Sequence, residues 1–131
     1  MKASHWAIAA TVLIATSCTK EPGVGGKAEI RGRVFITEYD NNTGQPNGNT
    51  YFAPDYRVYV IYGDNDFYDD NVDTDPDGLF VYSWLRKGKY TVFTYSDCPT
   101  CESGVEVVSK SVEIGGKKDV VDVGTFEVEK W

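Results

Sequence analysis

Residues 75–92 read DPDGLFVYSWLRKGKYTV and carry the clearest structural pattern in the chain. Apolar and aromatic residues alternate with other residues on both sides of a short basic turn. This spacing of two is typical of β-strands, in which alternate side chains share one face. Gly88 lies in the turn, where a residue without a Cβ accepts the backbone conformations of a tight connection. The segment therefore predicts a β-hairpin whose inward-facing residues are Phe80, Tyr82, Tyr90 and Val92.

The same alternation extends along the rest of the chain. Residues 27–38 alternate between an apolar and a charged face, and residues 56–62, 105–114 and 120–128 are rich in the Val, Ile and Tyr that favour strands. Segments 40–54 and 63–78 are polar and are expected to be loops. No window shows the spacing of an amphipathic helix. The sequence therefore predicts an all-β fold, a single small antiparallel β-sandwich of about seven strands with Ig-like architecture.

Four segments together resemble a known family. Residues 75–92, with their acidic turn, alternate aromatics and Gly88, resemble the carboxypeptidase-regulatory-like, or prealbumin-like (transthyretin-like), β-sandwich domains. Ile30–Val34 and Thr43–Pro46 resemble the opening strand and the following turn of that family, and Val121–Val128 resembles its closing strand. The resemblance implies a prealbumin-like sandwich. Relatives with this fold include scaffolding domains and enzymes whose activity depends on histidine.

The N-terminus resembles a bacterial lipoprotein signal. Lys2 precedes an apolar run, Trp6–Ala15, that is too short to span a bilayer, and small residues lead directly to Cys18. The resemblance implies that Cys18 is lipidated and that the protein is anchored in the outer membrane of the cell envelope, either periplasmic or surface-exposed. The alternative is an ordinary secretory signal. The expected domains are a signal peptide at 1–17, the lipidated cysteine with a flexible tether at 18–26, and the sandwich at 27–131.

Composition limits the partners and the chemistry. Lys and Arg total 13 against 20 Asp and Glu, which gives a formal net charge of −7. This balance excludes nucleic acid as a partner and argues against docking on anionic lipid through a polybasic patch. The one histidine, His5, lies in the expected signal peptide, so a mature chain has no histidine for a nucleophilic triad or a metal site. We therefore expect a protein that is not an enzyme.

An acidic segment is the first candidate site. The chain from residue 64 to residue 77 holds seven aspartates and no Lys or Arg, and such carboxylates repel one another unless a cation or solvent screens them. Residues 73–78 match the first half of a calcium loop, but Trp84 occupies the position of the final Glu ligand. The alternatives are a solvated loop and a non-EF-hand calcium site. The candidate calcium ligands are Asp64, Asp66, Asp73, Asp75 and Asp77.

The pair Cys98 and Cys101 forms a CxxC motif. A thioredoxin-like redox site requires a strand-to-helix context that the surrounding strands do not offer. A zinc site requires two further soft ligands, and no other Cys or His lies in the expected sandwich. The remaining interpretation, a structural disulfide that closes a loop in an oxidising compartment, is the one that we expect.

Aromatic residues in the two expected loops are the third candidate site. Exposed rings beside carboxylates and amides commonly stack on sugars, so segments 40–55 and 63–78 form a recognition surface if they lie close together in space. We therefore expect a lipid-anchored binding protein for a glycan or a protein partner. The alternative is a structural subunit that docks onto a larger outer-membrane complex. The candidate ligand-binding residues are Tyr51, Phe52, Phe67 and Tyr68.

Overall fold

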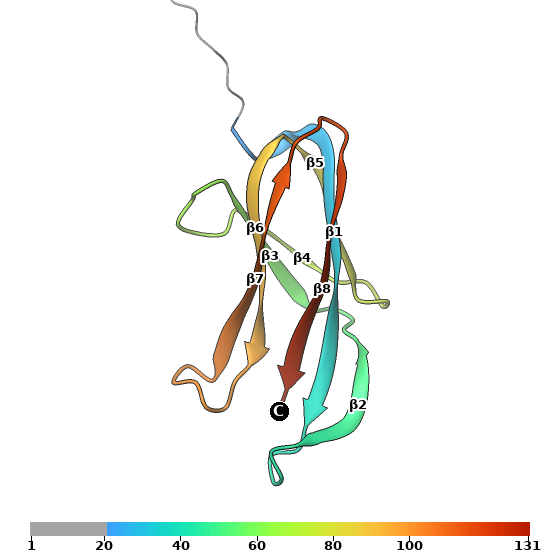
Figure 1. The fold of residues 1–131 in the computed structure, drawn as a ribbon, viewed down its shortest axis with the longest axis vertical. Helices are drawn as coiled ribbons and strands as arrows, with labels where there is room; N and C mark the ends of the chain where they lie inside the picture. Colours follow the sequence, from blue (N-terminus) through green and yellow to red (C-terminus); the bar gives the residue numbers. More distant parts are fainter. Residues whose placement is uncertain (1–20) are drawn as a thin grey trace, which may run out of the picture.

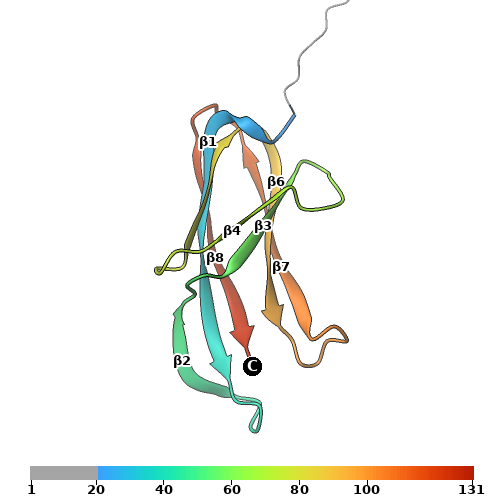
Figure 2. The same cartoon turned by 180° about the vertical axis from the view of Figure 1, so that it is seen from behind.

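The computed structural model describes residues 21–131, so the expected signal peptide and Cys18 lie outside the described residues. Two β-sheets pack face to face, and eight strands make up the described chain (Figures 1 and 2). Within this part of the chain no helix is long and apolar enough to cross a bilayer. The predicted all-β sandwich is confirmed.

The first sheet is built on the long strand β1 (Val24–Tyr39). Its N-terminal half pairs with β5 (Leu79–Leu85) and its C-terminal half with β2 (Pro46–Phe52), both antiparallel. Strand β8 (Val120–Lys130) runs along β1 in parallel orientation. This parallel pair departs from the expected antiparallel sandwich, because the first and last strands of the domain meet in one sheet.

The second sheet has the order β4-β3-β6-β7, and all its pairs are antiparallel. Its strands are β3 (Arg57–Tyr62), β4 (Asp70–Asp73), β6 (Gly88–Asp97) and β7 (Val105–Ile114). The β5–β6 connection passes from the first sheet to the second. The segment predicted to be a hairpin therefore forms two consecutive strands that belong to different sheets.

The core lies between the two sheets and follows the predicted alternation. All four residues predicted to face inward from β5 and β6 are buried, and they pack with apolar residues of β1, β3 and β8. Burial of this apolar surface supplies the main free energy of folding. The largest fully buried side chains of the core include Tyr90, Phe80, Phe126, Ile30 and Leu85.

Two strands occupy segments that were expected to be loops. Strand β2 lies within 40–54 and strand β4 within 63–78, so the sandwich has eight strands where about seven were expected. Both are edge strands with mostly exposed side chains, and backbone pairing holds them in place. Their sequences are polar for this reason, and they lack the apolar alternation by which strands are recognised.

The chain joins the sandwich earlier than expected. Strand β1 begins at Val24, inside the segment assigned to the tether. The backbone N–H of Gly23 donates to the Tyr90 hydroxyl over 2.8 Å, and that hydroxyl donates to the Arg86 carbonyl over 2.7 Å. Pro22 packs so closely on Gly88 that a Cβ there would lie 2.4 Å from its Cγ. Residues 22–26 are therefore part of the folded domain.

Candidate functional site

Four aromatic residues form a continuous strip on the outer face of the second sheet. We call this set, Tyr59, Tyr68, Phe93 and Tyr95, the aromatic strip. Tyr59 lies on β3, between Val58 and Val60, which face the core, so its own side chain faces outward. The register pairs Tyr59 with Phe93 of β6, and Tyr68 precedes β4.

Ring contacts hold the aromatic strip together. Tyr59 stacks on Phe93 with ring centroids 5.0 Å apart and planes inclined by 14°. Tyr68 and Tyr95 approach Tyr59 edge-on, at centroid distances of 4.9 and 5.6 Å. Offset stacks and edge contacts of this kind are the arrangements that aromatic pairs favour. The strip is therefore preorganised before any ligand arrives.

The two ends of the aromatic strip are open to solvent. Tyr68 is 52% exposed and Tyr95 is 42% exposed, whereas Phe93 is almost buried beneath its neighbours. Val107 of β7 pairs with Tyr95 and extends the apolar surface. An apolar surface of this kind on a small soluble domain often marks a binding site.

Polar groups border the aromatic strip on its β4 side. Asn71 pairs with Tyr59 across the β3–β4 ladder. Two positions further along the same ladder, Arg57 donates from Nε to Asp73 Oδ1 over 3.0 Å. This hydrogen bond is the main cause that raises the pKa of the Arg57 guanidinium. An apolar aromatic surface bordered by an amide and a charged pair can stack on one face of a ligand and hydrogen-bond its edge.

The four predicted ligand-binding aromatics do not form one surface. Tyr51 and Phe52 lie on β2 in the first sheet, whereas Phe67 and Tyr68 lie in the loop before β4 in the second (Figure 1). The assumption that segments 40–55 and 63–78 lie together is therefore wrong for residues 63–69. Only Tyr68 of the four belongs to the aromatic strip.

Phe52 and Tyr51 are already engaged by neighbouring side chains. Arg33 lies over the Phe52 ring at 5.1 Å, and Phe35 meets the same ring edge-on. The Tyr51 hydroxyl donates to Glu38 Oε1 over 2.9 Å. The hydrogen bonds from Asn49 and Tyr51 lower the pKa of Glu38. These rings therefore stabilise β2 against β1, and Arg33 already covers one face of the Phe52 ring.

The predicted calcium ligands are divided between two places. Strand β4 runs between the loop that holds Asp64 and Asp66 and the turn that holds Asp75 and Asp77, and the two segments lie on opposite sides of the molecule in both views (Figures 1 and 2). Among residues 21–131, no three of these carboxylates bring oxygens within 4.8 Å of one another. The calcium prediction thus lacks the converging ligand set that it requires.

Protein groups already use two of these carboxylates. Asp73 pairs with Arg57, as described above. Asp75 Oδ1 accepts the backbone N–H groups of Asp77 and Leu79, each over 2.9 Å, and so shapes the turn into β5. Gly78 completes this turn with a φ of 75°, and a Cβ there would lie 2.8 Å from the Val34 carbonyl oxygen. The calcium-like spacing of residues 73–78 therefore has a structural explanation.

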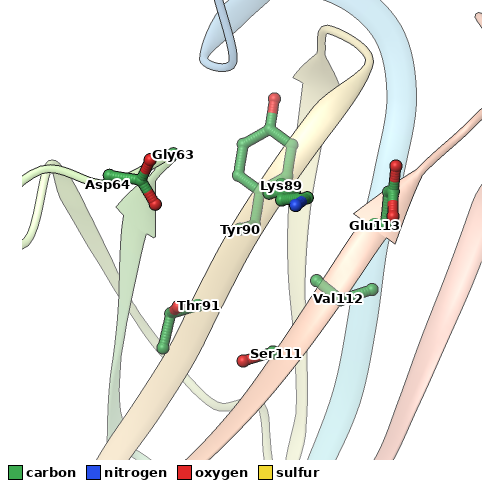
Figure 3. A pocket seen from close by; sticks show the side chains of 8 residues that line it. All are labelled: Gly63, Asp64, Lys89, Tyr90, Thr91, Ser111, Val112 and Glu113. Atoms are coloured by element: carbon green, nitrogen blue, oxygen red, sulfur yellow. The ribbon is translucent and has the colours of Figure 1, made fainter.

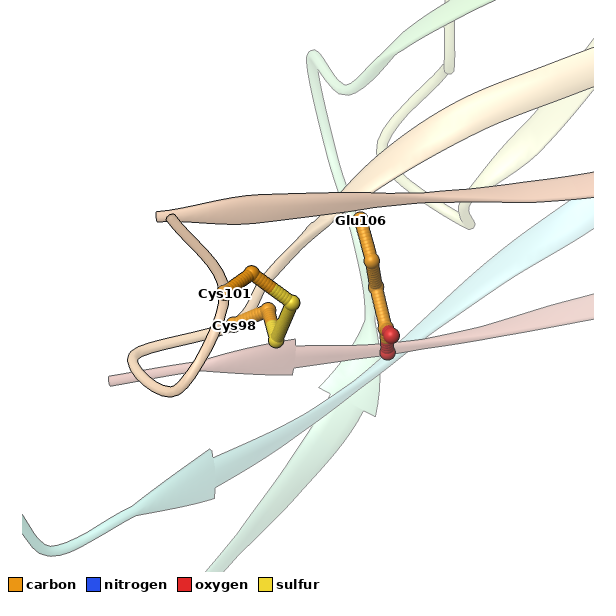
Figure 4. Close-up of side chains that lie close together, drawn as sticks. All are labelled: Cys98, Cys101 and Glu106. Carbon is orange, nitrogen blue, oxygen red and sulfur yellow. A yellow bond between two sulfur atoms is a disulfide. The ribbon is translucent and has the colours of Figure 1, made fainter. Parts of the chain in front are cut away.

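The structure joins Cys98 and Cys101 in a disulfide within the β6–β7 connection, in agreement with the predicted structural role. Glu106 lies beside the two sulfurs (Figure 4), and the three side chains form the one group in residues 21–131 with potential metal-ligand spacing. Because both sulfurs are bonded to each other, neither is available as a thiolate ligand. The two cysteines therefore close the β6–β7 hairpin covalently.

A shallow depression lies where β6 begins and β7 ends in the second sheet (Figure 3). It has a volume of about 460 Å³ and is wide open to solvent. Tyr90 contributes to its wall, but its hydroxyl is engaged by Gly23 and Arg86, and burial raises its pKa. The depression thus holds charged surface groups without an evident nucleophile. Its lining residues are Gly63, Asp64, Lys89, Tyr90, Thr91, Ser111, Val112 and Glu113.

Comparison with known proteins yields structural similarities alone. No family model and no curated protein matches the sequence. A candidate carbohydrate-binding protein from Pseudomonas aeruginosa superposes with a TM-score of 0.48 at 14% identity, covering 82% of this chain and 91% of its own. An (S)-allantoin synthase superposes with a TM-score of 0.43 at 11% identity, covering 78% of this chain and 42% of its own. At these levels neither structure assigns a family or a function.

Sequence reasoning missed three members of the aromatic strip. Tyr59, Phe93 and Tyr95 all lie in expected strands, whereas the candidate ligand-binding aromatics came from the two expected loops. The signal that could have found them is the phase of the alternation. Phe93 and Tyr95 alternate with buried residues of β6, so they must face away from the core.

Proposed function

We propose that this chain is a lipid-anchored envelope protein whose prealbumin-like β-sandwich binds a glycan through the aromatic strip and has no enzymatic activity. The observation that carries the proposal is the stacked and partly exposed set of rings on the second sheet. Sugar rings present flat C–H faces that stack on aromatic rings, and their hydroxyls need donors and acceptors at the rim. Asn71 and the Arg57–Asp73 pair provide such groups.

The absence of enzymatic activity is supported by the side chains that are available. Residues 21–131 contain no histidine, and their two cysteines are bonded to each other. The lipid anchor is supported by the position of Cys18 directly after a short apolar run. An intact mass of the membrane-extracted protein tests the anchor, because acylation and signal cleavage at Cys18 change the mass in opposite and calculable ways.

Affinity electrophoresis of the full protein against a panel of polysaccharides tests glycan binding. We expect one glycan class to retard the protein. We also expect Tyr95→Ala to raise the dissociation constant for that glycan about tenfold or more, which corresponds to about 1.4 kcal/mol of binding free energy. Phe52→Ala is the matched control, because Phe52 is 40% exposed and Tyr95 is 42% exposed, but they lie on opposite sheets. Equal weakening by both variants, or no retardation by any glycan, contradicts the proposal.

The same panel, repeated with millimolar calcium and with a chelator, tests the calcium prediction. The divided positions of the aspartates lead us to expect equal retardation in both conditions. Calcium-dependent retardation, together with heat on titration of the protein with calcium, would restore the acidic segment as part of the site.

A docking subunit remains the second candidate, and one observation favours it. Strand β7 is an edge of the second sheet, and its outer face exposes Val105 and Val107 beside Tyr95. Exposed apolar edge strands are common docking sites. If docking is the function, Val107→Glu abolishes the recovery of a stoichiometric protein partner from solubilised membranes. If glycan binding alone is the function, Val107→Glu reduces the retardation by glycan and no such protein partner is found.

A further inference from the structure

Positive charge gathers at one end of this acidic protein. We call this end, made of residues 21–27, 84–89 and 115–120, the tether end, because the chain enters the sandwich there. The start of β1, the β5–β6 turn and the β7–β8 turn all lie at this end in both views (Figures 1 and 2). Backbone hydrogen bonds from Arg86 to Gly23 and from Glu29 to Asp119 join the three segments.

The tether end carries six cationic side chains and two carboxylates, although the whole chain has a net charge of −7. One of the carboxylates, Asp119, accepts the backbone N–H of Gly116 over 2.7 Å and so belongs to the turn. Five of the six cationic residues are exposed, and Arg86 is partly buried. The cationic residues are Lys27, Arg86, Lys87, Lys89, Lys117 and Lys118.

Trp84 is exposed at the tether end because the backbone departs from regular strand geometry. Strict alternation after Phe80 and Tyr82 would turn Trp84 toward the core. A register shift in the β1–β5 pairing, where both Val24 and Ala28 oppose Leu85, breaks the alternation. Trp84 adopts a φ of 61°, and Leu85 takes the buried position while Trp84 is left 67% exposed.

The backbone conformation at Trp84 is unusual for a large side chain. Left-handed φ values are strained for residues other than glycine, and bulges of this kind normally place glycine there. Strained backbone conformations cluster at functional sites, so a strained residue with an exposed aromatic ring is a candidate functional residue. Two more exposed apolar residues, Val24 and Val120, lie at the same end.

We infer that the tether end rests on the anionic phospholipid headgroups of the membrane, with Trp84 inserted at the interface between headgroups and acyl chains. This inference rests on the lipid anchor of the proposed function. Cys18 precedes Pro22 by four residues, and four extended residues reach at most about 14 Å, so an anchored sandwich must hold this end close to the bilayer.

Charge and side-chain type both match that surface. Lysines near a bilayer are attracted by the negative surface potential of anionic lipids, and tryptophan is enriched at membrane interfaces. The net charge of the chain argued against such a patch. The fold changes that conclusion for most of the acidic segment, because the turn that holds Asp75 and Asp77 lies away from the two basic turns (Figures 1 and 2). Asp64 and Glu113 are the exceptions, since both line the same depression as Lys89.

Hydrogen–deuterium exchange of the processed, membrane-extracted protein tests the inference. The protein is reconstituted in vesicles of phosphatidylcholine alone and in vesicles that contain about one-quarter phosphatidylglycerol. In the anionic vesicles we expect about fivefold slower exchange of the amides in turns 86–87 and 115–119. Residues 98–104, at the other end of β6 and β7, provide an internal reference that should not change. Equal exchange in both vesicle types overturns the inference.

Charge reversal provides the matched comparison. The double variant Lys117→Glu and Lys118→Glu should abolish the added protection in anionic vesicles. The double variant Arg57→Glu and Lys130→Glu changes the charge by the same amount away from the tether end and should retain it. If the first variant keeps full protection, or if both variants lose it equally, the inference is wrong.

Vesicle flotation separates failure of this inference from failure of the proposed function. A protein without a lipid anchor does not float with neutral vesicles, whereas an anchored protein whose tether end stays in solvent floats but gains no protection. Retardation by glycan reports on the aromatic strip independently, and we expect reversal at Lys117 and Lys118 to leave it unchanged.

Discussion

The outer faces of the two sheets use aromatic residues in opposite ways. On the first sheet, Arg33 covers the ring of Phe52, and Arg31 forms an ion pair with Glu29 nearby. On the second sheet, Tyr59 and Phe93 stack on each other, and in residues 21–131 no cation is found over either ring. Both faces arise from the same alternation of inward and outward residues.

The difference shows how one pattern produces a closed face and an open face. A guanidinium over a ring is attracted to the ring's electron-rich face and shields that face from water. A ligand must therefore displace the cation before it can stack on the same face. A ring that contacts other rings keeps part of its surface available. Exposure alone therefore does not distinguish Phe52 from Tyr95, but their neighbours do.

The largest expected effect comes from truncating a large side chain in the core between the two sheets. Phe126 is fully buried, and its ring centroid lies 5.9 Å from that of Phe80. We expect Phe126→Ala to lower the free energy of unfolding by about 3–5 kcal/mol, measured by urea denaturation. The exposed Val107→Ala should change it by less than about 0.5 kcal/mol. Comparable losses for both variants would contradict this assignment of the core.

The second sheet contains a disulfide, which closes the connection between β6 and β7. Replacing both Cys98 and Cys101 with Ser removes a small closed loop, and the chain-entropy model gives a loss of about 2 kcal/mol. Chemical denaturation of the variant, beside the wild type with and without reductant, measures this loss. Titration of two free thiols in the native wild type would show that the bond is absent.

A hydrogen bond between the sheets predicts sensitivity to high pH. The Tyr82 hydroxyl of the first sheet donates to the Val58 carbonyl of the second over 2.7 Å, and burial raises its pKa above the ordinary value of 10.0. Because only the unfolded chain ionises readily at this tyrosine, its stabilising effect is full below pH 10 and falls as the pH rises further.

Tyr82→Phe tests this link between the sheets. We expect a loss of about 1 kcal/mol at neutral pH, from the missing hydrogen bond, and a smaller decline of stability above pH 10. Denaturation midpoints measured from pH 7 to pH 11 give both values. A variant whose alkaline decline matches that of the wild type would assign the decline to the other buried tyrosines.

The smallest expected effect concerns the cover on the first face. Arg33→Ala removes the cation over Phe52 and should cost about 0.5–1 kcal/mol in the free energy of unfolding. Lys130→Ala, which removes a weak surface pair with Glu38, is the control and should cost less. If uncovering Phe52 also creates a new glycan affinity, the contrast between the two faces depends on this one cation.

Local pattern was sufficient to predict the core and the strand class. The alternation around Ile30 and Val34 and the aromatic pair Phe80 and Tyr82 gave the correct inward faces, because burial of one face imposes a period of two on the sequence. The CxxC pair likewise indicated the disulfide, since its surroundings and the absence of nearby histidine excluded the other chemistries.

The candidate site could not be assembled from local pattern. Tyr59, Tyr68 and Tyr95 come from two strands and a loop, and the pairing of β3 with both β6 and β4 brings them together. Local alternation also gives the wrong burial for Trp84, because a bulge in the pairing with β1 turns its side chain outward. Pairing over long sequence distance decides both outcomes.

The parallel pair of β1 and β8 determines when the domain can finish folding. The first strand of the sandwich pairs with its last strand, from Glu29 opposite Val120 to Glu38 opposite Lys130. One edge of β1 therefore stays unpaired until β8, the last strand of the domain, is available. Contacts this distant along the chain slow folding, and an unpaired edge invites aggregation. The last strand of this small domain is therefore the one that completes its first sheet.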